Sequence, residues 1–449
     1  MSALPNDVLE SISKTIETTN AEIDARYPVL PGARQAVHTV YGGAHLFKAG
    51  LAAKLGKVAL KNLHGYGGDA PAELAEVLGL EAQGPDAASL FDRVKAKLER
   101  EPVEDFRIDF EDGYGNRSDE EEDGHAVQAA QQTAEGMEAG SLPPFVGIRI
   151  KPFSGELYKR SLKTLELYLS TLAEATGGKL PDGFVVTLPK IKSPDQVAAL
   201  CGALDAIEKN LGIQGSVPVE LMVETTQAII GHDGRCTLPA LAEAAGGRCR
   251  SAHFGTYDYT AECGITAAFQ THTHAACDHA RHAMQVAFAG TGIMISDGAT
   301  TVMPVPVHRA KKDGPALTDA QKLDNTASVH TAWALHAENI RHSLEHGIYQ
   351  GWDLHPAQLV VRYAVVYDFF HAGLPAATTR LKNFVDQLGQ ATLSGDVFDD
   401  AATGQGLLNF FLLGIACGAF EDDAALACGL TKDELRSKSF VQIAQNRRK

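Results

Sequence analysis

Two carboxylates follow short apolar segments of the sequence at positions where they could hold a metal ion. Glu224 ends the segment LMVET, and Asp258 lies in HFGTYDY, just after the next such segment. Mg²⁺ typically takes one or two carboxylates and completes its coordination with water and substrate oxygens. The pair therefore indicates a site for a hard divalent cation. The alternative is two unrelated loop carboxylates, one of which caps the following helix.

Basic residues end two other segments. Arg149 lies in GIRIKPF, and its guanidinium fork can hold a substrate carboxylate or stabilise a developing enolate oxygen. A salt bridge to Glu111 or Asp112 is the structural alternative. Lys151 and Lys190 are weaker candidates: a lysine at such a position can form a Schiff base, but the polar surroundings in PKIKS favour ion pairing.

Further acidic and histidine residues extend this set of candidates. Glu111 and Asp112 in DFEDG can orient a neighbouring arginine or bind a metal through water. Asp297 in ISDGA and Asp353 in GWDLHP are candidates for proton transfer, with a turn and a helix cap as the alternatives. The histidines in THTHAACDHARH (272–282) have spacings that can bind zinc. No third ligand is evident there, so we interpret them as structural or surface residues.

These candidates lie at the ends of short apolar segments that alternate with helical stretches between about residues 36 and 360. Segments rich in Val, Ile and Phe that alternate with helices are typical of a parallel sheet covered by helices. Eight units predict a (β/α)8 TIM barrel, in which the carboxyl ends of the strands form the active site. An open doubly wound sheet is the alternative, but no G-x-G-x-x-G follows the first segment, which disfavours dinucleotide binding. The expected strands lie within 35–43, 106–113, 145–153, 183–191, 217–225, 250–259, 291–299 and 350–356. The expected helices include 156–175, 194–211, 237–244 and 275–289.

The barrel is expected over residues 36–360, between a helical N-terminal arm (1–35) and a helical C-terminal extension (361–449). The longest apolar run, residues 407–420, is shorter than the ~20 residues that span a bilayer. We interpret it as a buried or intersubunit helix and expect a homo-oligomer.

Composition narrows the class of partner. The chain has 449 residues with 56 acidic and 40 basic side chains, a net charge of −16, which argues against nucleic acid as a main partner but allows a small anionic substrate. Seven cysteines without a C-x-x-C disfavour both a disulfide framework and a thiolate zinc site. The first residues carry no apolar signal segment. We therefore expect a cytoplasmic protein without a membrane partner.

Five segments, taken together and in order, resemble the HpcH/HpaI aldolase and citrate lyase β-subunit-like superfamily, to which malate synthase is more distantly related. They are DFEDGYG, GIRIKPF, TLPKIKSPDQV, LMVETTQAI followed by HFGTYDYTAECG, and QGWDLHPAQL. The set covers about residues 105–360. Two features depart from the family pattern: the chain is longer than a typical citrate lyase β subunit, and HTVYGGAHLF lacks the arginine-bearing start common in members that use coenzyme A.

The resemblance implies a Mg²⁺- or Mn²⁺-dependent carbon–carbon lyase that acts through an enolate. Its substrate would be a small carboxylate, a short oxo- or hydroxy-acid or its coenzyme A thioester. Carried over, Glu224 and Asp258 would bind the metal, and Arg149 would bind the substrate carboxylate or enolate, with Glu111 and Asp112 as supporting acids. The further substrate-binding residues that we expect are Lys190, Gly255 and Thr256.

Three other functions remain open at this point. The first is a malate synthase-like condensation of glyoxylate with acetyl-CoA, and the second is a pyruvate-type aldolase. The third, from a different class, is a non-catalytic barrel that serves as a binding subunit. The basic stretch VHRAKK (307–312) is a candidate phosphate site for a coenzyme A tail, with a solvated loop as the alternative.

Overall fold

The computed structural model describes residues 4–27, 34–68, 70–213, 215–310, 314–390 and 401–447. Its centre is a closed barrel of eight parallel strands, in which each strand pairs with its neighbours in sequence and β8 closes onto β1. Each strand overlaps a segment expected from the sequence, so the predicted (β/α)8 barrel is confirmed. The strands are β1 (His38–Gly43), β2 (Asp105–Asp109), β3 (Phe145–Arg149), β4 (Val185–Leu188), β5 (Val219–Val223), β6 (Cys249–Phe254), β7 (Met294–Ala299) and β8 (Gln350–Asp353).

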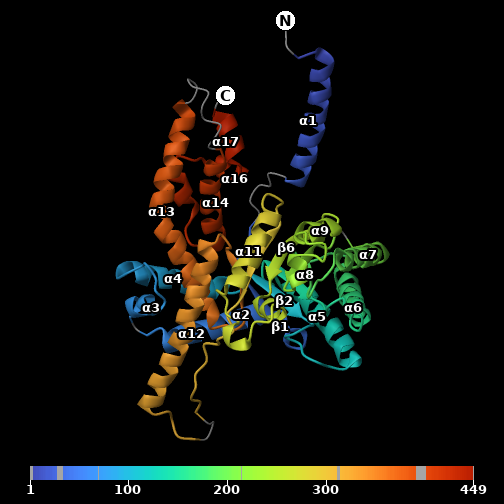
Figure 1. Cartoon of the computed structure of the whole chain (residues 1–449). Helices are drawn as coiled ribbons and strands as arrows, with labels where there is room; N and C mark the ends of the chain where they lie inside the picture. The colour runs from blue at the N-terminus through green and yellow to red at the C-terminus, as the bar shows by residue number, and fades with distance from the viewer. Residues whose placement is uncertain are drawn as a thin grey trace.

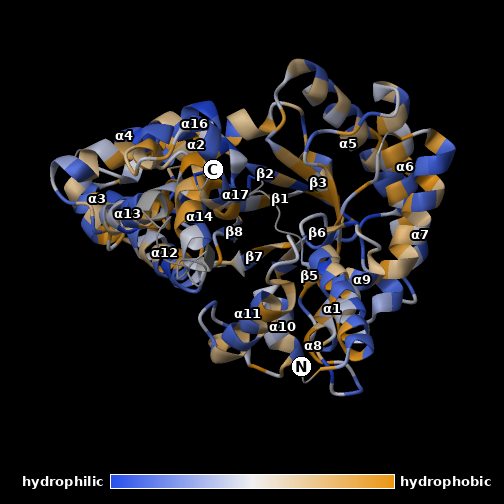
Figure 2. Cartoon of the chain, turned by 90° about the horizontal axis from the view of Figure 1, so that it is seen from above, coloured by the Kyte–Doolittle hydropathy of each residue, from blue (hydrophilic) through white to orange (hydrophobic). Residues whose placement is uncertain are grey.

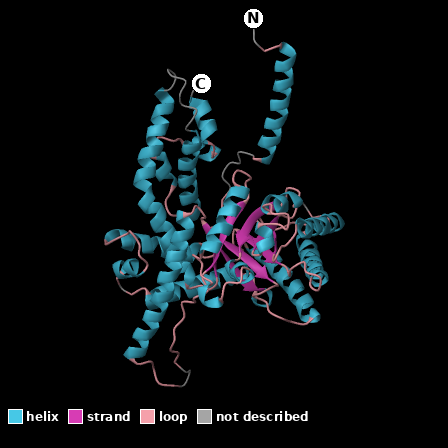
Figure 3. Ribbon diagram, in the orientation of Figure 1, coloured by secondary structure: helices cyan, strands magenta, loops and turns pink. Residues whose placement is uncertain are grey.

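Helices cover the outside of the barrel (Figures 2 and 3). The longer ones are α2 (Leu51–Tyr66), α4 (Pro85–Arg100), α5 (Asp119–Ala139), α6 (Tyr158–Thr176), α7 (Pro194–Leu211), α11 (Ala275–Phe288) and α12 (Asp319–Glu345). The shorter ones are α3 (Pro71–Val77), α8 (Thr226–Ile229), α9 (Leu238–Ala244) and α10 (Thr256–Glu262), with 3-10 turns η1 (Ala44–Leu46) and η2 (Ala267–Phe269). Local signals set the ends: α7 begins with a capping box between Ser193 and Gln196 and ends at the left-handed Gly212.

Two helical parts lie outside the barrel on the same side of it (Figure 1). One is the N-terminal α1 (Asn6–Arg26). The other is a column of C-terminal helices, whose members are α13 (Gln358–Gln390), α14 (Ala401–Cys417), α15 (Asp422–Leu426), α16 (Lys432–Ser437) and α17 (Phe440–Arg447). The apolar run 407–420 falls mainly on α14, where the Phe410 ring lies 5.2 Å from that of Phe370 on α13. Among the described residues, no helix is both long and apolar enough to cross a membrane.

Strand residues alternate between the helix layer and the barrel interior. On β2, Phe106 and Ile108 belong to the apolar core. The alternate residues of the same strand point into the barrel and make ion pairs there. They are Asp105, Arg107 and Asp109. Barrel interiors are usually filled by branched aliphatic side chains, so this one is unusual in being filled largely by charged and polar groups.

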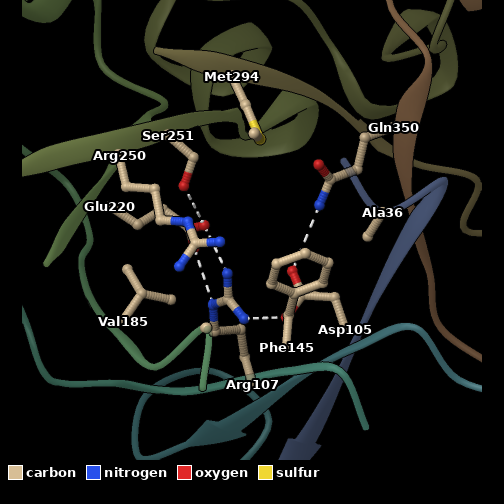
Figure 4. A pocket seen from close by; sticks show the side chains of 11 residues that line it. Ala36, Asp105, Arg107, Phe145, Val185, Glu220, Arg250, Ser251, Met294 and Gln350 are labelled. Carbon is tan, nitrogen blue, oxygen red and sulfur yellow. Dashed lines mark hydrogen bonds and ion pairs between the residues drawn. The ribbon is translucent and has the colours of Figure 1, made fainter. Parts of the chain in front are cut away.

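An ion-pair network fills the amino end of the barrel (Figure 4). Arg107 donates to Glu220 through Nε (3.0 Å) and Nη2 (2.6 Å) and also pairs with Asp105. Ser251 donates to Glu220 at 2.6 Å. Although burial disfavours its charge, Arg107 and His253 hold the pKa of Glu220 well below its ordinary value. The remaining cavity is about 20 Å³, which is room for about one water molecule.

A second set of buried ion pairs joins the strands to the helix layer. Asp353 at the end of β8 accepts from Arg362 Nη2 (2.9 Å) and lies 3.0 Å from His336 Nε2. Asp297 on β7 accepts from Arg281 Nε at 2.8 and 2.9 Å. Despite burial, these partners lower the pKa of both carboxyl groups. The contacts favour structural roles over the proton-transfer roles considered for Asp297 and Asp353.

Replacing Asp353 should strongly destabilise the fold. Asp353→Asn leaves the buried Arg362 without its counter-charge, and breaking a buried pair in this way costs about 3–5 kcal/mol. Because the folded pKa is lowered, this stabilisation is present above about pH 4 and is lost as the pH falls further. Urea unfolding at pH 7 measures the change. Asp319→Asn at an exposed position is the matched control, and equal effects of the two substitutions would contradict the assignment.

Candidate active site

The carboxyl ends of the strands bring four carboxylates together around one ammonium group. Lys190 Nζ lies 2.7 Å from Glu111, 3.3 Å from Asp112, 3.3 Å from Asp258 and 4.0 Å from Glu224. We call these four acidic residues the carboxylate cluster. Every acidic residue predicted from the sequence for metal binding or support thus lies at one point of the barrel mouth.

Lys190 is held at this point by its backbone. It follows β4 with a left-handed φ of 51°, a conformation that is uncommon for residues other than glycine and that often marks functional positions. Its N–H donates to Glu224 Oε1 at 2.8 Å. Burial lowers the pKa of Lys190, but the negative charges of Glu224 and Glu111 outweigh this effect and raise the pKa above its ordinary value. Lys190 is therefore an ammonium ion, which disfavours Schiff-base chemistry because that needs a free amine.

Glu224 is the most deeply buried member of the cluster, with a residue exposure of 1%. It lies against Gly255, where a Cβ atom would be only 2.5 Å from Glu224 Oε2. Burial raises the pKa of Glu224 to about 8, and the negative charge of Asp258 adds to this against the opposing effect of Lys190. Lys190 and the neighbouring Arg149, which is already paired with Asp109, thus leave the cluster short of positive charge.

Arg149 borders the cluster and is fixed by a residue that the sequence analysis did not identify. Its Nε and Nη2 donate to Asp109 at 2.7 and 2.6 Å, so the expected salt bridge to Glu111 or Asp112 is the lesser contact. Nη1 lies 3.2 Å from Glu111 but donates no hydrogen bond to any described residue. The guanidinium carbon lies 4.8 Å from the Tyr41 ring centre and 5.5 Å from that of Trp352. Arg149 is therefore rigidly oriented with one group of N–H donors left for a ligand.

Two more polar atoms near the mouth lack a partner among the described residues. They are the indole N–H of Trp352 on β8 and the hydroxyl of Thr256 at the start of α10. The centre of the Trp352 ring lies 4.1 Å from that of the Tyr41 ring. A buried polar group without a partner costs about 1–3 kcal/mol. These atoms, with Arg149 Nη1, are the groups that an anionic ligand can satisfy.

Other predicted residues lie apart from this point or contribute differently. Lys151 Nζ bonds the Phe110 carbonyl at 2.6 Å and pairs with Glu122 at 2.8 Å, which ties β3 to α5. The Gly255 N–H already donates to the Val223 carbonyl, so its contribution is space for Glu224. In the stretch 307–312, only 307–310 is described, and Lys311 and Lys312 lie outside the described residues.

The sequence analysis missed Asp109, Tyr41 and Trp352. One signal was present, since the alternation in EDFRIDFED places Asp109 on the same strand face as Asp105 and Arg107. The contact between Asp109 and Arg149 further depends on the register of β2 and β3, which sets these two residues side by side. No local sequence pattern specifies that register.

The barrel has the fold of a solved citrate lyase, as the motif resemblance predicted. The chain belongs to the family described as a domain of unknown function, DUF6986, which matches residues 16–443. No curated protein sequence is significantly similar.

Solved structures share the architecture at low identity. A citrate lyase from Burkholderia xenovorans LB400 is similar with a TM-score of 0.53 and 19% identity, covering 89% of this chain and 96% of that one. A malate synthase from Haloferax volcanii has a TM-score of 0.43 and 14% identity, and the match covers 74% of this chain and 70% of that one. An HpcH/HpaI aldolase/citrate lyase family protein from Burkholderia cenocepacia J2315 has a TM-score of 0.38 and 12% identity, and the match covers 76% of this chain and 95% of that one. At these identities, the first of them supports the fold alone.

A side chain at position 255 should disturb the site. In Gly255→Ala the new Cβ meets Glu224 at 2.5 Å, and overpacking of this kind typically costs about 1–3 kcal/mol. Gly202→Ala is the matched control, because Gly202 lies in α7 with nothing near its Cβ position and alanine there should stabilise the helix by about 0.5–1 kcal/mol. Urea unfolding compares them. Equal or greater stability of Gly255→Ala than wild type would contradict this packing.

Proposed function

We propose that this protein is a divalent-metal-dependent carbon–carbon lyase that acts through an enolate on a short oxo- or hydroxy-acid or its coenzyme A thioester. The observation that carries the proposal is the pairing of two features at one barrel mouth. The carboxylate cluster converges on Lys190 Nζ, and Arg149 beside it has an Nη1 group that lies 3.2 Å from Glu111 but donates no hydrogen bond to a described residue. The first feature suits a cation and the second suits an anion, which together are what metal-assisted enolate chemistry needs.

The donor set of the cluster fits Mg²⁺ or Mn²⁺. All its ligand atoms are carboxylate oxygens, which hard cations prefer, and four carboxylates share one ammonium. In the described part of the chain, no group of three or more His, Cys, Asp or Glu side chains is placed to hold a metal ion by itself. The fit is therefore to an ion that uses Glu224 and Asp258 and takes its other ligands from water and substrate. Such an ion would act as a Lewis acid on a 2-oxo acid.

The side chains of the chain then have separable tasks. Arg149 Nη1 and the indole N–H of Trp352 donate to the substrate carboxylate or to the enolate oxygen. Asp109 holds Arg149 in position through two hydrogen bonds, so little reorganisation is needed when negative charge develops. Glu111 joins the two halves of the site, because it contacts both Lys190 and Arg149. Glu111 and Asp112 hold the Lys190 ammonium group in position through ion pairs.

Three related activities share this machinery. Cleavage of a hydroxy-acid, aldol addition of pyruvate, and condensation of glyoxylate with acetyl-CoA all pass through an enolate next to a carbonyl group. They differ in which partner loses its α-proton and in whether a thioester is bound. A non-catalytic binding subunit, the candidate from another class, needs neither the metal nor the enolate.

Metal binding should depend on the two proposed ligands. Mn²⁺ or Mg²⁺ should raise the Tm of the wild-type protein, since a ligand at about 100 times its Kd adds about 2.7 kcal/mol to stability. Glu224→Gln and Asp258→Asn should abolish the rise. Glu262→Gln is the control, because Glu262 is a nearby carboxylate paired with Lys192 rather than with Lys190. A wild-type Tm that no divalent cation changes would favour the binding-subunit alternative.

The indole N–H should contribute to binding of a planar dianion. Oxalate resembles the enolate of pyruvate in shape and charge, and Trp352→Phe removes the N–H while keeping an aromatic ring beside Tyr41. A hydrogen bond to a charged group contributes about 1.5–3 kcal/mol, so the oxalate Kd should rise by about tenfold or more in calorimetry with Mn²⁺ present.

The matched control for Trp352→Phe is Tyr257→Phe. It removes a hydroxyl near the same rim that already donates to the Ala299 carbonyl at 3.0 Å, so the oxalate Kd should stay nearly constant. Equal oxalate affinity in wild type and Trp352→Phe would show that the indole does not contact the ligand.

A further inference from the structure

Helix α1 is an amphipathic helix whose apolar side is not buried against the rest of the described chain. None of its residues is buried. Val8, Ile12, Ile16 and Ile23 recur at helical spacing and are 39%, 49%, 52% and 48% exposed; we call them the α1 stripe. A stripe at this spacing normally faces a packed surface, and most of the stability of helices in proteins comes from packing of such a face. We therefore expect the α1 stripe to pack against an apolar protein surface.

A groove of matching character lies at the amino end of the barrel. It has a volume of about 1090 Å³ and runs between the end of α11, the starts of β7 and β8, and the helices α14 and α16. We call it the amino-end groove. Its apolar lining is provided by Phe288, Ile293, Tyr349, Leu412, Leu413 and Leu435. Leu412 and Leu413 are only half-buried, so the run 407–420 is not fully covered within its own chain.

The charges of the helix and of the groove are complementary. Acidic residues of α1 outnumber basic ones, with Asp7, Glu10, Glu17, Glu22 and Asp24 against Lys14 and Arg26. The groove has the opposite balance, with Arg34, Lys432, Arg436 and Lys438 against Asp422. Complementary charge around an apolar contact sets orientation and suppresses wrong partners. An acidic amphipathic helix is therefore the kind of occupant that suits this groove.

The placement of α1 favours a second copy of the chain as the source of that helix. Arg34 and Gln35, which follow α1, line the groove, and the Tyr27 ring lies beside Gly290 on its wall. From there α1 leads away from the barrel and stands apart from the column of α13 and α14 (Figure 1). In the structure α1 does not lie in the groove of its own chain (Figure 1). In an exchange between two copies related by a two-fold axis, the groove of each copy receives the helix of the other.

We propose that this protein forms a dimer in which α1 of each copy lies in the amino-end groove of the other. The α1 stripe then packs on Leu412, Leu413 and Tyr349, and Glu22 and Asp24, which flank the stripe, lie nearest the basic groove rim. The proposed activity is not needed for this inference. The expected assembly is reciprocal, so each copy both gives a helix and receives one.

Light scattering after size-exclusion chromatography of the full chain tests the exchange. Wild type should have the mass of a dimer, and Ile12→Glu/Ile16→Glu should have that of a monomer with an unchanged Tm for the barrel, because both side chains are exposed within one chain. Ala21→Glu adds one negative charge to the opposite face of α1 and should remain dimeric. A monomeric wild type would overturn the proposal in favour of docking within one chain or of another partner.

A groove variant tests the other half of the interface. Ala416→Glu places bulk and negative charge in the groove and should also give a monomer. If this variant stays dimeric while Ile12→Glu/Ile16→Glu is monomeric, α1 docks elsewhere and the groove assignment is wrong. If the α1 variant itself stays dimeric, the dimer uses a different surface and the exchange is wrong. Circular dichroism of each variant confirms that the helices are retained.

Discussion

Charges placed inside the barrel must be neutralised there, because the protein interior solvates ions poorly. At the amino end this condition is met: Arg107 lies between Asp105 and Glu220, and hydroxyl groups complete the network. In the middle, Arg149 and Asp109 neutralise each other through two hydrogen bonds. At the mouth negative charge is in excess, since four carboxylates surround Lys190, and Arg149, which also contacts Glu111 and Asp112, is already paired with Asp109. The site is thus the place where the protein's own charges do not balance.

This imbalance links the architecture to the chemistry. The alternation of β2 points its charged residues inward and its phenylalanine and isoleucine outward, so a stable helix layer and an ionic interior arise from the same strand. The inner network then orients Arg149, with the rings of Tyr41 and Trp352 beside its guanidinium group. An incoming cation and anion would each complete a set of contacts that the protein leaves open. In our account this is why the cluster is acidic although the proposed substrate is itself an anion.

The sequence predicts the fold better than it predicts the details of the site. The eight strands were recognisable because each is a short apolar run followed by polar residues, and strand ends gather at one face in any parallel barrel. The same reasoning placed Glu224, Asp258 and Arg149 at that face. It did not identify Asp109 as the partner of Arg149, because that contact depends on the register of β2 and β3. Nor did it predict the left-handed backbone of Lys190, which is held by a hydrogen bond to Glu224 on the neighbouring strand end.

We propose that the barrel mouth stabilises an enolate with the help of a divalent cation. The most direct measurement is the exchange of α-protons for deuterium in D₂O, followed by NMR, with pyruvate and acetyl-CoA offered separately and then each with glyoxylate. We expect Mn²⁺- or Mg²⁺-dependent exchange into one of the two, and its identity separates an aldolase from a thioester enzyme. Absence of exchange into both, with the metal demonstrably bound and glyoxylate present, would contradict the enolate account.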